Sequence, residues 1–248
     1  MEVLVERKDD ICYVTLNRPE KKNALNSRML EVLNETFFEI SKDSSIKVVI
    51  LRGAGGNFCS GHDLKELLRD PLEVRRHFEL CGNLMRAIRN APQPVIAEVE
   101  GYAVAGGCQL VAVCDLAVAS EDAKFGLPGI KLGIFCFTPT VFVSRNVSVK
   151  RAFELAITGK LIDAKTALEW GLVNEVVEKD RLRETAESFA KEIAKFDFET
   201  ISSGKRFFYT QLEMNVFGAL EYGINTISLY SASEPAREGI RAFLEKRR

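Results

Sequence analysis

Two glycine-rich loops contain the residues of this chain that are best suited to chemistry. The first loop is NFCSGHDL, residues 57–64, and the second is GYAVAGGCQL, residues 101–110. Glycine lets a backbone approach a ligand closely, and an N–H group in the first turn of a helix has no partner within that helix. Two such N–H groups that converge on one oxygen form an oxyanion hole, where each donor stabilises developing charge by about 3–4 kcal/mol. Close packing of a strand against a helix is the alternative explanation for these glycines.

Ionisable side chains are scarce beside these loops. His62 lies in the first loop and titrates near neutral pH if nothing perturbs it, whereas Gln109 in the second loop is a neutral amide. Cys108 and Cys136 have no obvious base near them, so we interpret them as small apolar packing residues. His77 is expected on a helix whose apolar face does not include it, which predicts a solvated histidine.

Two further patterns leave alternatives open. Glu98 and Glu100 point to one side of a predicted strand that leads to the second loop, so they either approach the site or form salt bridges. The stretch GAGGNF, residues 53–58, begins like a dinucleotide-binding fingerprint. Phe58 occupies the place of its third glycine, and no helix clearly begins there, so a nucleotide site is the weaker hypothesis for this loop.

Each of the two loops follows a predicted buried strand. The runs KVVILRG, residues 47–53, and QPVIAEVEG, residues 93–101, are continuously apolar or nearly so, which is typical of strands buried on both faces. Ligands of α/β proteins bind at the carboxyl ends of such strands. Both loops begin at these ends, so a ligand site is expected between them.

Toward the C-terminus the chain changes from strands to helices. Apolar periodicity predicts a hairpin over 2–7 and 11–17, strands near 116–120 and 173–178, and helices over 27–41, 73–91, 148–160, 163–171, 180–195, 198–211, 215–231 and 235–246, with another helix from about Gly106. Ser27 and Asp163 are expected to cap two of these helices. This order predicts an α/β fold with a core over residues 1–195 and a helical C-terminal region over residues 196–248.

The composition is that of an ordinary globular protein. Of the 248 residues 46% are hydrophobic and 28% charged, and the net charge of −1 gives no electrostatic reason to expect nucleic-acid or membrane binding. The six cysteines are scattered and only two histidines are present, so no metal site is expected and the thiols are interpreted as reduced. The N-terminus does not read as a signal peptide, which predicts a cytoplasmic protein, although a processed organellar form would look the same.

Five segments, in order along the chain, resemble the enoyl-CoA hydratase/isomerase or crotonase superfamily. They are NRPEKKNALN (17–26), FCSGHDLKE (58–66), PVIAEVEGYAVAGGCQLVAVCDLAVAS (94–120), FGLPGIKLGI (125–134) and REGIRAFLEKR (237–247). The resemblance implies a spiral of ββα turns, followed by helices that pack trimers, which commonly pair into hexamers. It also implies an acyl-CoA thioester as the small-molecule ligand, with no further cofactor.

The same resemblance assigns roles to individual positions. The backbone N–H groups of His62 and Gly106 would form the oxyanion hole. The family pattern uses the backbone of His62 rather than its ring, so a catalytic role for the ring is the weaker alternative. The coenzyme A part would lie against the KKNAL segment, the first loop and the C-terminal EKR, at Lys22, Ala24, Leu25, Ser60, Gly61, Asp63, Leu64 and Lys246.

This chain departs from the family pattern where the pattern has acids. Hydratases of the family carry glutamates at the positions of Gln109 and Gly129, and dienoyl-CoA isomerases carry an acid at a position that corresponds to Phe137. Hydration needs a base to activate water and an acid to protonate the α-carbon, and each contributes about 10²–10⁴-fold. The sequence therefore predicts an acyl-CoA-binding protein that hydrates poorly. Its chemistry, if it has any, would be enolate-stabilising, such as decarboxylation or isomerisation.

Other interpretations stay open. The alternative to an enzyme is a non-catalytic acyl-CoA sensor or assembly subunit. RNA binding, which has precedent in the superfamily, ranks last because the basic residues are dispersed among acids. The aromatic-rich stretch IFCFTPTVF, residues 134–142, predicts a narrow apolar pocket for the acyl chain.

Overall fold

The fold is built on two sheets, and the computed structural model describes them within residues 1–245. Lys246 lies outside the described residues. The larger sheet has six strands in the order β1-β2-β3-β4-β6-β9, of which only β1 and β2 pair antiparallel. Its strands are β1 (Val3–Lys8), β2 (Ile11–Leu16), β3 (Val48–Gly53), β4 (Val95–Val99), β6 (Leu116–Ser120) and β9 (Glu175–Val177).

Alternation of side chains along the strands divides the core between the two faces of this sheet. On β3, Val49 and Leu51 belong to the larger core, whereas Val48 and Ile50 face a smaller core that is covered by the helix Leu182–Ala194 (α7). Both faces are therefore buried, as the apolar run of β3 predicts.

A second, three-stranded sheet makes the fold a spiral. It consists of β5 (Tyr102–Val104), β7 (Lys124–Gly126) and β8 (Leu161–Asp163) in the order β5-β7-β8. The chain passes from β4 to β5 and then into the helix Gly106–Val113 (α3), and from β6 to β7 and then toward the helix Phe137–Asn146 (α4). This repetition of two strands and a helix is the expected ββα spiral.

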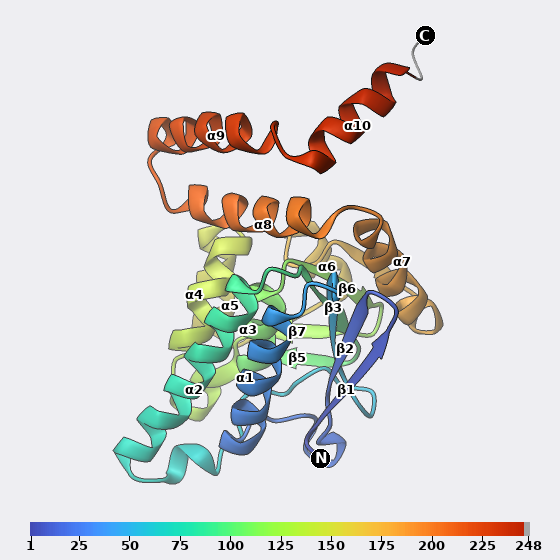
Figure 1. The fold of residues 1–248 in the computed structure, drawn as a ribbon. Coiled ribbons are helices and arrows are strands. Elements are labelled where there is room, and N and C mark those ends of the chain that lie inside the picture. Colours follow the sequence, from blue (N-terminus) through green and yellow to red (C-terminus); the bar gives the residue numbers. More distant parts are fainter. Residues whose placement is uncertain (246–248) are drawn as a thin grey trace.

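The other helices of the core cover the sheets (Figure 1). They are α1 (Ser27–Lys42), α2 (Pro71–Asn90), α5 (Val149–Thr158) and α6 (Ala164–Glu169), with 3₁₀ turns η1 (Pro19–Lys21), η2 (Glu66–Leu68), η3 (Pro128–Leu132) and η4 (Lys179–Arg181). Asp163 caps α6 as predicted, since its side chain accepts the N–H of Thr166. The prediction that Ser27 caps α1 was wrong: Asn26 is the cap and accepts the N–H of Met29, which leaves the Ser27 hydroxyl for other contacts.

Three helices end the described chain: α8 (Phe198–Leu212), α9 (Val216–Tyr230) and α10 (Glu234–Glu245). Helix α8 lies against the core, and α9 and α10 lie beyond it (Figure 1). Lys205 of α8 holds this contact, because its Nζ donates to Asp115 Oδ2 at 2.7 Å and to the carbonyls of Ile88 and Gln93. Helix α9 exposes apolar side chains, among them Val216, Phe217, Leu220, Ile227 and Leu229. The division at residue 195 stays a prediction.

Candidate functional site

The two glycine-rich loops meet after β3 and β4. The N–H of Cys59 donates to the carbonyl of Tyr102 at 2.8 Å, and the N–H of Val104 donates to the carbonyl of Cys59 at 3.0 Å. A β-carbon placed on Gly61 would lie 2.9 Å from Cβ of Ala105. Gly61 also has a φ of +99°, which side chains disfavour, so only glycine fits this contact. The structure thus brings together the loops that the sequence singled out.

Two backbone N–H groups at this junction have no acceptor within residues 1–245. One belongs to Gly106, the first residue of α3, and the other to His62. Ala105, which precedes α3, has a φ of +48°, a conformation that alanine rarely adopts. Unpaired N–H groups in such a turn are suited to bind a ligand oxygen. Their role at a thioester stays a prediction.

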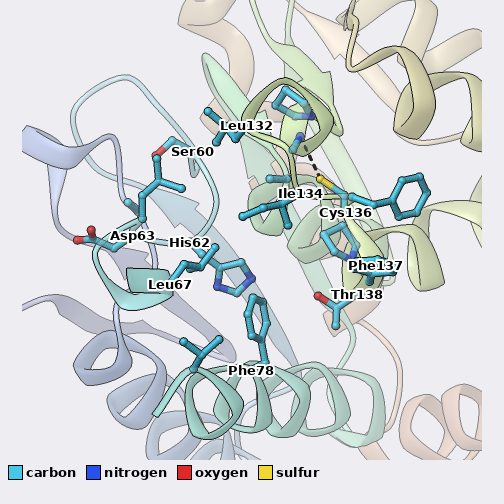
Figure 2. A pocket seen from close by; sticks show the side chains of 18 of the residues that line it. Ser60, His62, Asp63, Leu67, Phe78, Leu132, Ile134, Cys136, Phe137 and Thr138 are labelled. Atoms are coloured by element: carbon cyan, nitrogen blue, oxygen red, sulfur yellow. Dashed lines mark hydrogen bonds between the residues drawn. The ribbon is translucent and has the colours of Figure 1, made fainter. Parts of the chain in front are cut away.

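A pocket of about 700 Å³ opens beside these N–H groups. Ser60, His62 and Asp63 line one side, and the segment from Gly129 to Pro139 lines the other, as Figure 2 shows. Its wall is mostly apolar, with Phe78, Leu132, Ile134, Phe135 and Phe137 among the lining residues. The volume falls in the range of small-molecule sites. The apolar wall that was predicted from residues 134–142 is present over residues 134–139, whereas the narrowness of the pocket and its role for an acyl chain stay predictions.

The positions expected to bind coenzyme A divide into two groups. Ala24, Ser60, Asp63 and Leu64 line the pocket. Leu25, Gly61 and Lys22 are not among the described lining residues. Nζ of Lys22 lies 4.6 Å from the centroid of the Tyr102 ring instead, and its neighbour Lys21 is the lysine at the pocket. Lys22 has a left-handed φ of +48°, which the sequence does not signal.

The two positions where hydratases of the family have glutamates, 109 and 129, place no carboxylate in the pocket. Gln109 lies in α3, is 2% exposed and is not among the described residues that line the pocket. Gly129 lines the pocket, and its N–H donates to Sγ of Cys136 at 3.3 Å (Figure 2, dashed line). A β-carbon on Gly129 would lie 2.5 Å from the carbonyl oxygen of Ile134. The segment around Ile134 therefore occupies the space that a side chain at 129 would need.

The remaining candidates around the pocket are apolar. Phe137 is 72% exposed, lines the pocket and contacts the Phe135 ring at a centroid distance of 5.2 Å. Burial raises the pKa of Cys108 to about 12, so its thiol stays protonated and inert. Among the described lining residues Asp63 is the only carboxylate, and it pairs with Arg18 at 3.1 Å.

Glu98 and Glu100 do not approach the pocket. Burial, followed by repulsion from Glu187 and Glu100, raises the pKa of Glu98 to about 7. Glu100 forms an ion pair with Lys179. Neither carboxylate is among the described lining residues, so the alternative of ion pairing holds for Glu100 and the approach to the site is wrong for both.

His77 is buried, at 1% exposed, so the prediction of a solvated histidine was wrong. The buried face of α2 consists of His77, Cys81, Leu84, Met85 and Ile88. His77 stands four residues before Cys81 and so belongs to this helical spacing, a signal that the sequence contained. Its Nε2 lies 2.8 Å from Nδ1 of His62, and its Nδ1 lies 3.1 Å from Oγ of Ser27.

Both histidines are neutral near pH 7. Burial lowers the pKa of His62 to about 3, and the neighbouring His77 lowers it further toward that value. Burial also lowers the pKa of His77, although Glu66 opposes this shift. A neutral imidazole carries one N–H donor and one nitrogen lone pair, so the partners of each ring decide which nitrogen is protonated.

Other kinds of site find no support in the described part of the chain. Residues 1–245 contain no cluster of three His, Cys, Asp or Glu side chains placed to hold a metal ion. The helices described here include none that is long and apolar enough to cross a membrane.

Comparisons with known proteins agree with this geometry. The model of the Enoyl-CoA hydratase/isomerase family matches residues 6–248. The chain is 40% identical over 251 residues to the rat protein named enoyl-CoA hydratase domain-containing protein 3, mitochondrial, covering 98% of this chain and 81% of that protein.

Two solved structures also resemble this chain closely in fold and sequence. An enoyl-CoA hydratase from Mycobacterium smegmatis superposes with a TM-score of 0.97 at 42% identity, covering 100% of this chain and 98% of that one. Human enoyl coenzyme A hydratase domain-containing protein 3 also gives a TM-score of 0.97, at 38% identity, covering 100% of this chain and 99% of that one. On its sequence, its spiral of ββα turns and these likenesses, the chain belongs to the enoyl-CoA hydratase/isomerase family.

Proposed function

We propose that this protein binds an acyl-CoA thioester in the pocket, polarises its carbonyl at the N–H groups of His62 and Gly106, and does not hydrate enoyl-CoA efficiently. One observation carries the proposal: two unpaired N–H groups adjoin a large apolar pocket that has no carboxylate at positions 109 and 129. Polarisation of a thioester needs only the donors. Addition of water needs an acid and a base as well.

Such a site favours reactions that pass through an enolate. In decarboxylation the bond between the α-carbon and the carboxylate breaks, CO₂ leaves, and the electron pair becomes the enolate without any base. In isomerisation a proton moves from one carbon of the acyl chain to another. Each oxyanion donor contributes about 10²–10³-fold to such a step.

The coenzyme A part would lie along Lys21, Ala24 and Ser60, with the thioester at Gly106 and the acyl chain against Phe135 and the aromatic wall. This direction is supported by Ser60 and Asp63, which lie at one side of the pocket, and by Phe137, which lies at the other (Figure 2). Lys246 stays a candidate for the phosphates.

Assembly and location are part of the same proposal. The exposed apolar side chains of α9 support a trimer, or a hexamer of two trimers, in which neighbouring copies cover them. The rat relative is named as a mitochondrial protein, which favours the processed organellar form over a cytoplasmic location for this chain.

A mass-spectrometric screen of CoA thioesters tests the proposed function. Pure protein is incubated with enoyl, hydroxyacyl and malonyl types, and binding and products are recorded. We expect saturable binding and an enolate-derived product, with a lower turnover in Gly106→Ala, because the new β-carbon would lie 3.1 Å from Nε2 of His62 and would push the two sides of the oxyanion site apart.

Gly204→Ala is the matched control, since a β-carbon there meets nothing within 4 Å. Binding without any product would favour the non-catalytic sensor or assembly subunit. Hydration of crotonyl-CoA at the speed of an ordinary hydratase would contradict the proposal.

A further inference from the structure

Four polar side chains form a continuous hydrogen-bonded series that ends at the pocket. Glu66 begins it in η2, where Ser27 Oγ donates to its Oε2 at 2.6 Å. Ser27 Oγ also lies 3.1 Å from Nδ1 of His77, and Nε2 of His77 lies 2.8 Å from Nδ1 of His62. Glu66 is 6% exposed and His77 1% exposed, so the series runs through the interior.

The donor and acceptor in each hydrogen bond of the series follow from the number of protons that each side chain carries. The single proton of the Ser27 hydroxyl is donated to the carboxylate of Glu66, so Nδ1 of His77 must donate to Ser27 Oγ. Nε2 of neutral His77 then carries a lone pair and accepts the Nδ1–H of His62. The proton of neutral His62 is thereby placed on Nδ1, and a lone pair is left on its Nε2.

That last nitrogen is the one without a partner. Nε2 of His62 is shielded from solvent and makes no hydrogen bond within the described residues. It lies beside the oxyanion N–H, because a β-carbon on Gly106 would be 3.1 Å away from it. Figure 2 shows the His62 ring turned toward Phe78 and away from Asp63. Most buried polar atoms have a hydrogen-bond partner, so a buried ring nitrogen without one, in a residue that lines the pocket, is suited to meet a ligand.

We propose that Nε2 of His62 is the proton-transfer group of this site for 3-enoyl-CoA thioesters, and that His77, Ser27 and Glu66 position it. The inference rests on the proposed function, because the thioester must first be held at Gly106. With His62 as the proton-transfer group, isomerisation is the enolate reaction that this site would catalyse. His62 would then do the work of the glutamates that are absent at positions 109 and 129.

The step is balanced with the groups present. Nε2 takes a proton from C2 of the acyl chain, and the C–H electron pair becomes a dienolate whose oxygen is held by the N–H groups of His62 and Gly106. The imidazolium then returns the proton to C4, which gives the 2-enoyl-CoA. The C2–H bond of a 3-enoyl thioester is activated by both the carbonyl and the double bond, so it suits a weak base.

The site creates two opposite charges side by side, and their attraction opposes the effect of burial, which disfavours an imidazolium at His62. The imidazolium of His62 forms next to the negative dienolate oxygen, and the carboxylate of Glu66 lies at the other end of the series. A thioester whose oxygen is bound at Gly106 would have its α-carbon on the side of the pocket where His62 lies, because a β-carbon on Gly106 would be 3.1 Å from Nε2. Shielding of Nε2 from water keeps the abstracted proton on the ring until it is returned.

The test follows conversion of 3-enoyl-CoA to 2-enoyl-CoA by the full-length protein, using substrate deuterated at C2. We expect turnover with part of the deuterium transferred to C4. His62→Asn retains an N–H donor in the place of Nδ1 and removes Nε2, so turnover should fall by at least about 10²-fold while the Kd for acyl-CoA stays the same. His62→Ala gives the same comparison if the asparagine variant misfolds.

Positioning is tested with Glu66→Gln, which keeps an acceptor for Ser27 and removes the charge. We expect about 10-fold lower kcat with unchanged Kd. Glu79→Gln, an exposed carboxylate on α2 that pairs with Arg75 at 2.8 Å, is the matched control and should behave as the wild type. NMR of ¹⁵N-labelled histidine is readily assigned, because the chain has only two histidines, and should show His62 protonated on Nδ1.

Several outcomes would overturn the inference. Equal turnover of wild type and His62→Asn would remove His62 Nε2 from the reaction and leave the proposed function intact. Binding of 3-enoyl-CoA without isomerisation would do the same, as would protonation of His62 on Nε2. Failure of the wild type to bind any acyl-CoA would refute the proposed function and, with it, the proton-transfer role.

Discussion

Replacing Gly129 by glutamate should not convert this protein into a hydratase. The new β-carbon would lie 2.5 Å from the carbonyl oxygen of Ile134 and 2.8 Å from Sγ of Cys136, whereas ordinary contacts are at least 3.4 Å. One of the two segments must therefore move by roughly 1 Å. Overpacking of this kind costs about 1–3 kcal/mol. At about 2–4 °C per kcal/mol for a chain of this size, the Tm should fall by about 2–12 °C.

Three variants separate the steric effect from the chemical one. Gly129→Ala should lose nearly as much Tm as Gly129→Glu, because the β-carbon causes the clash. Gly129→Glu combined with Gln109→Glu should still leave hydration of crotonyl-CoA at background, as measured by formation of 3-hydroxyacyl-CoA. An unchanged Tm together with a gain in hydration of about 10²-fold or more would show that a glutamate fits at position 129 and that the Ile134 segment does not exclude it.

The remaining predictions concern packing and pH. Lys205→Met should destabilise the fold by up to about 3 kcal/mol in urea unfolding, because it leaves the largely buried carboxylate of Asp115 with the N–H of Val95 but without its lysine; Asp115→Asn in the same chain should recover part of this loss. Gly107→Ala should abolish soluble expression, since its β-carbon would lie 2.0 Å from the carbonyl oxygen of Cys59. Burial raises the pKa of Glu98 from 4.5 to about 7, so the folded state holds a proton that the unfolded state has released. The free energy of unfolding should therefore fall as pH rises from about 4.5 to about 7, and Glu98→Gln should remove that slope.

The strands and glycine-rich loops that form the site were predicted well from the sequence, because they depend on local signals. Apolar runs end at both loops, and Gly61 and Gly107 mark contacts that no side chain allows. Helix boundaries followed from caps such as Asp163, although at α1 Asn26 rather than Ser27 is the cap.

What the sequence did not predict depends on contacts between distant segments. Ser27, Glu66 and His77 come from three different elements, and only folding brings their side chains together. The burial of His77 and the filling of the space beside Gly129 by Ile134 also arise from tertiary packing. The short strands β5, β7 and β8 were missed because three residues give too little alternation to recognise.

Incubation of the pure protein with a 2-enoyl-CoA in H₂¹⁸O is the most direct test of the central claim, that the pocket binds and polarises a thioester without adding water to it. We predict that the thioester is bound saturably and is recovered without ¹⁸O in its acyl chain. Rapid appearance of ¹⁸O-labelled 3-hydroxyacyl-CoA, lost in Gly106→Ala, would contradict it.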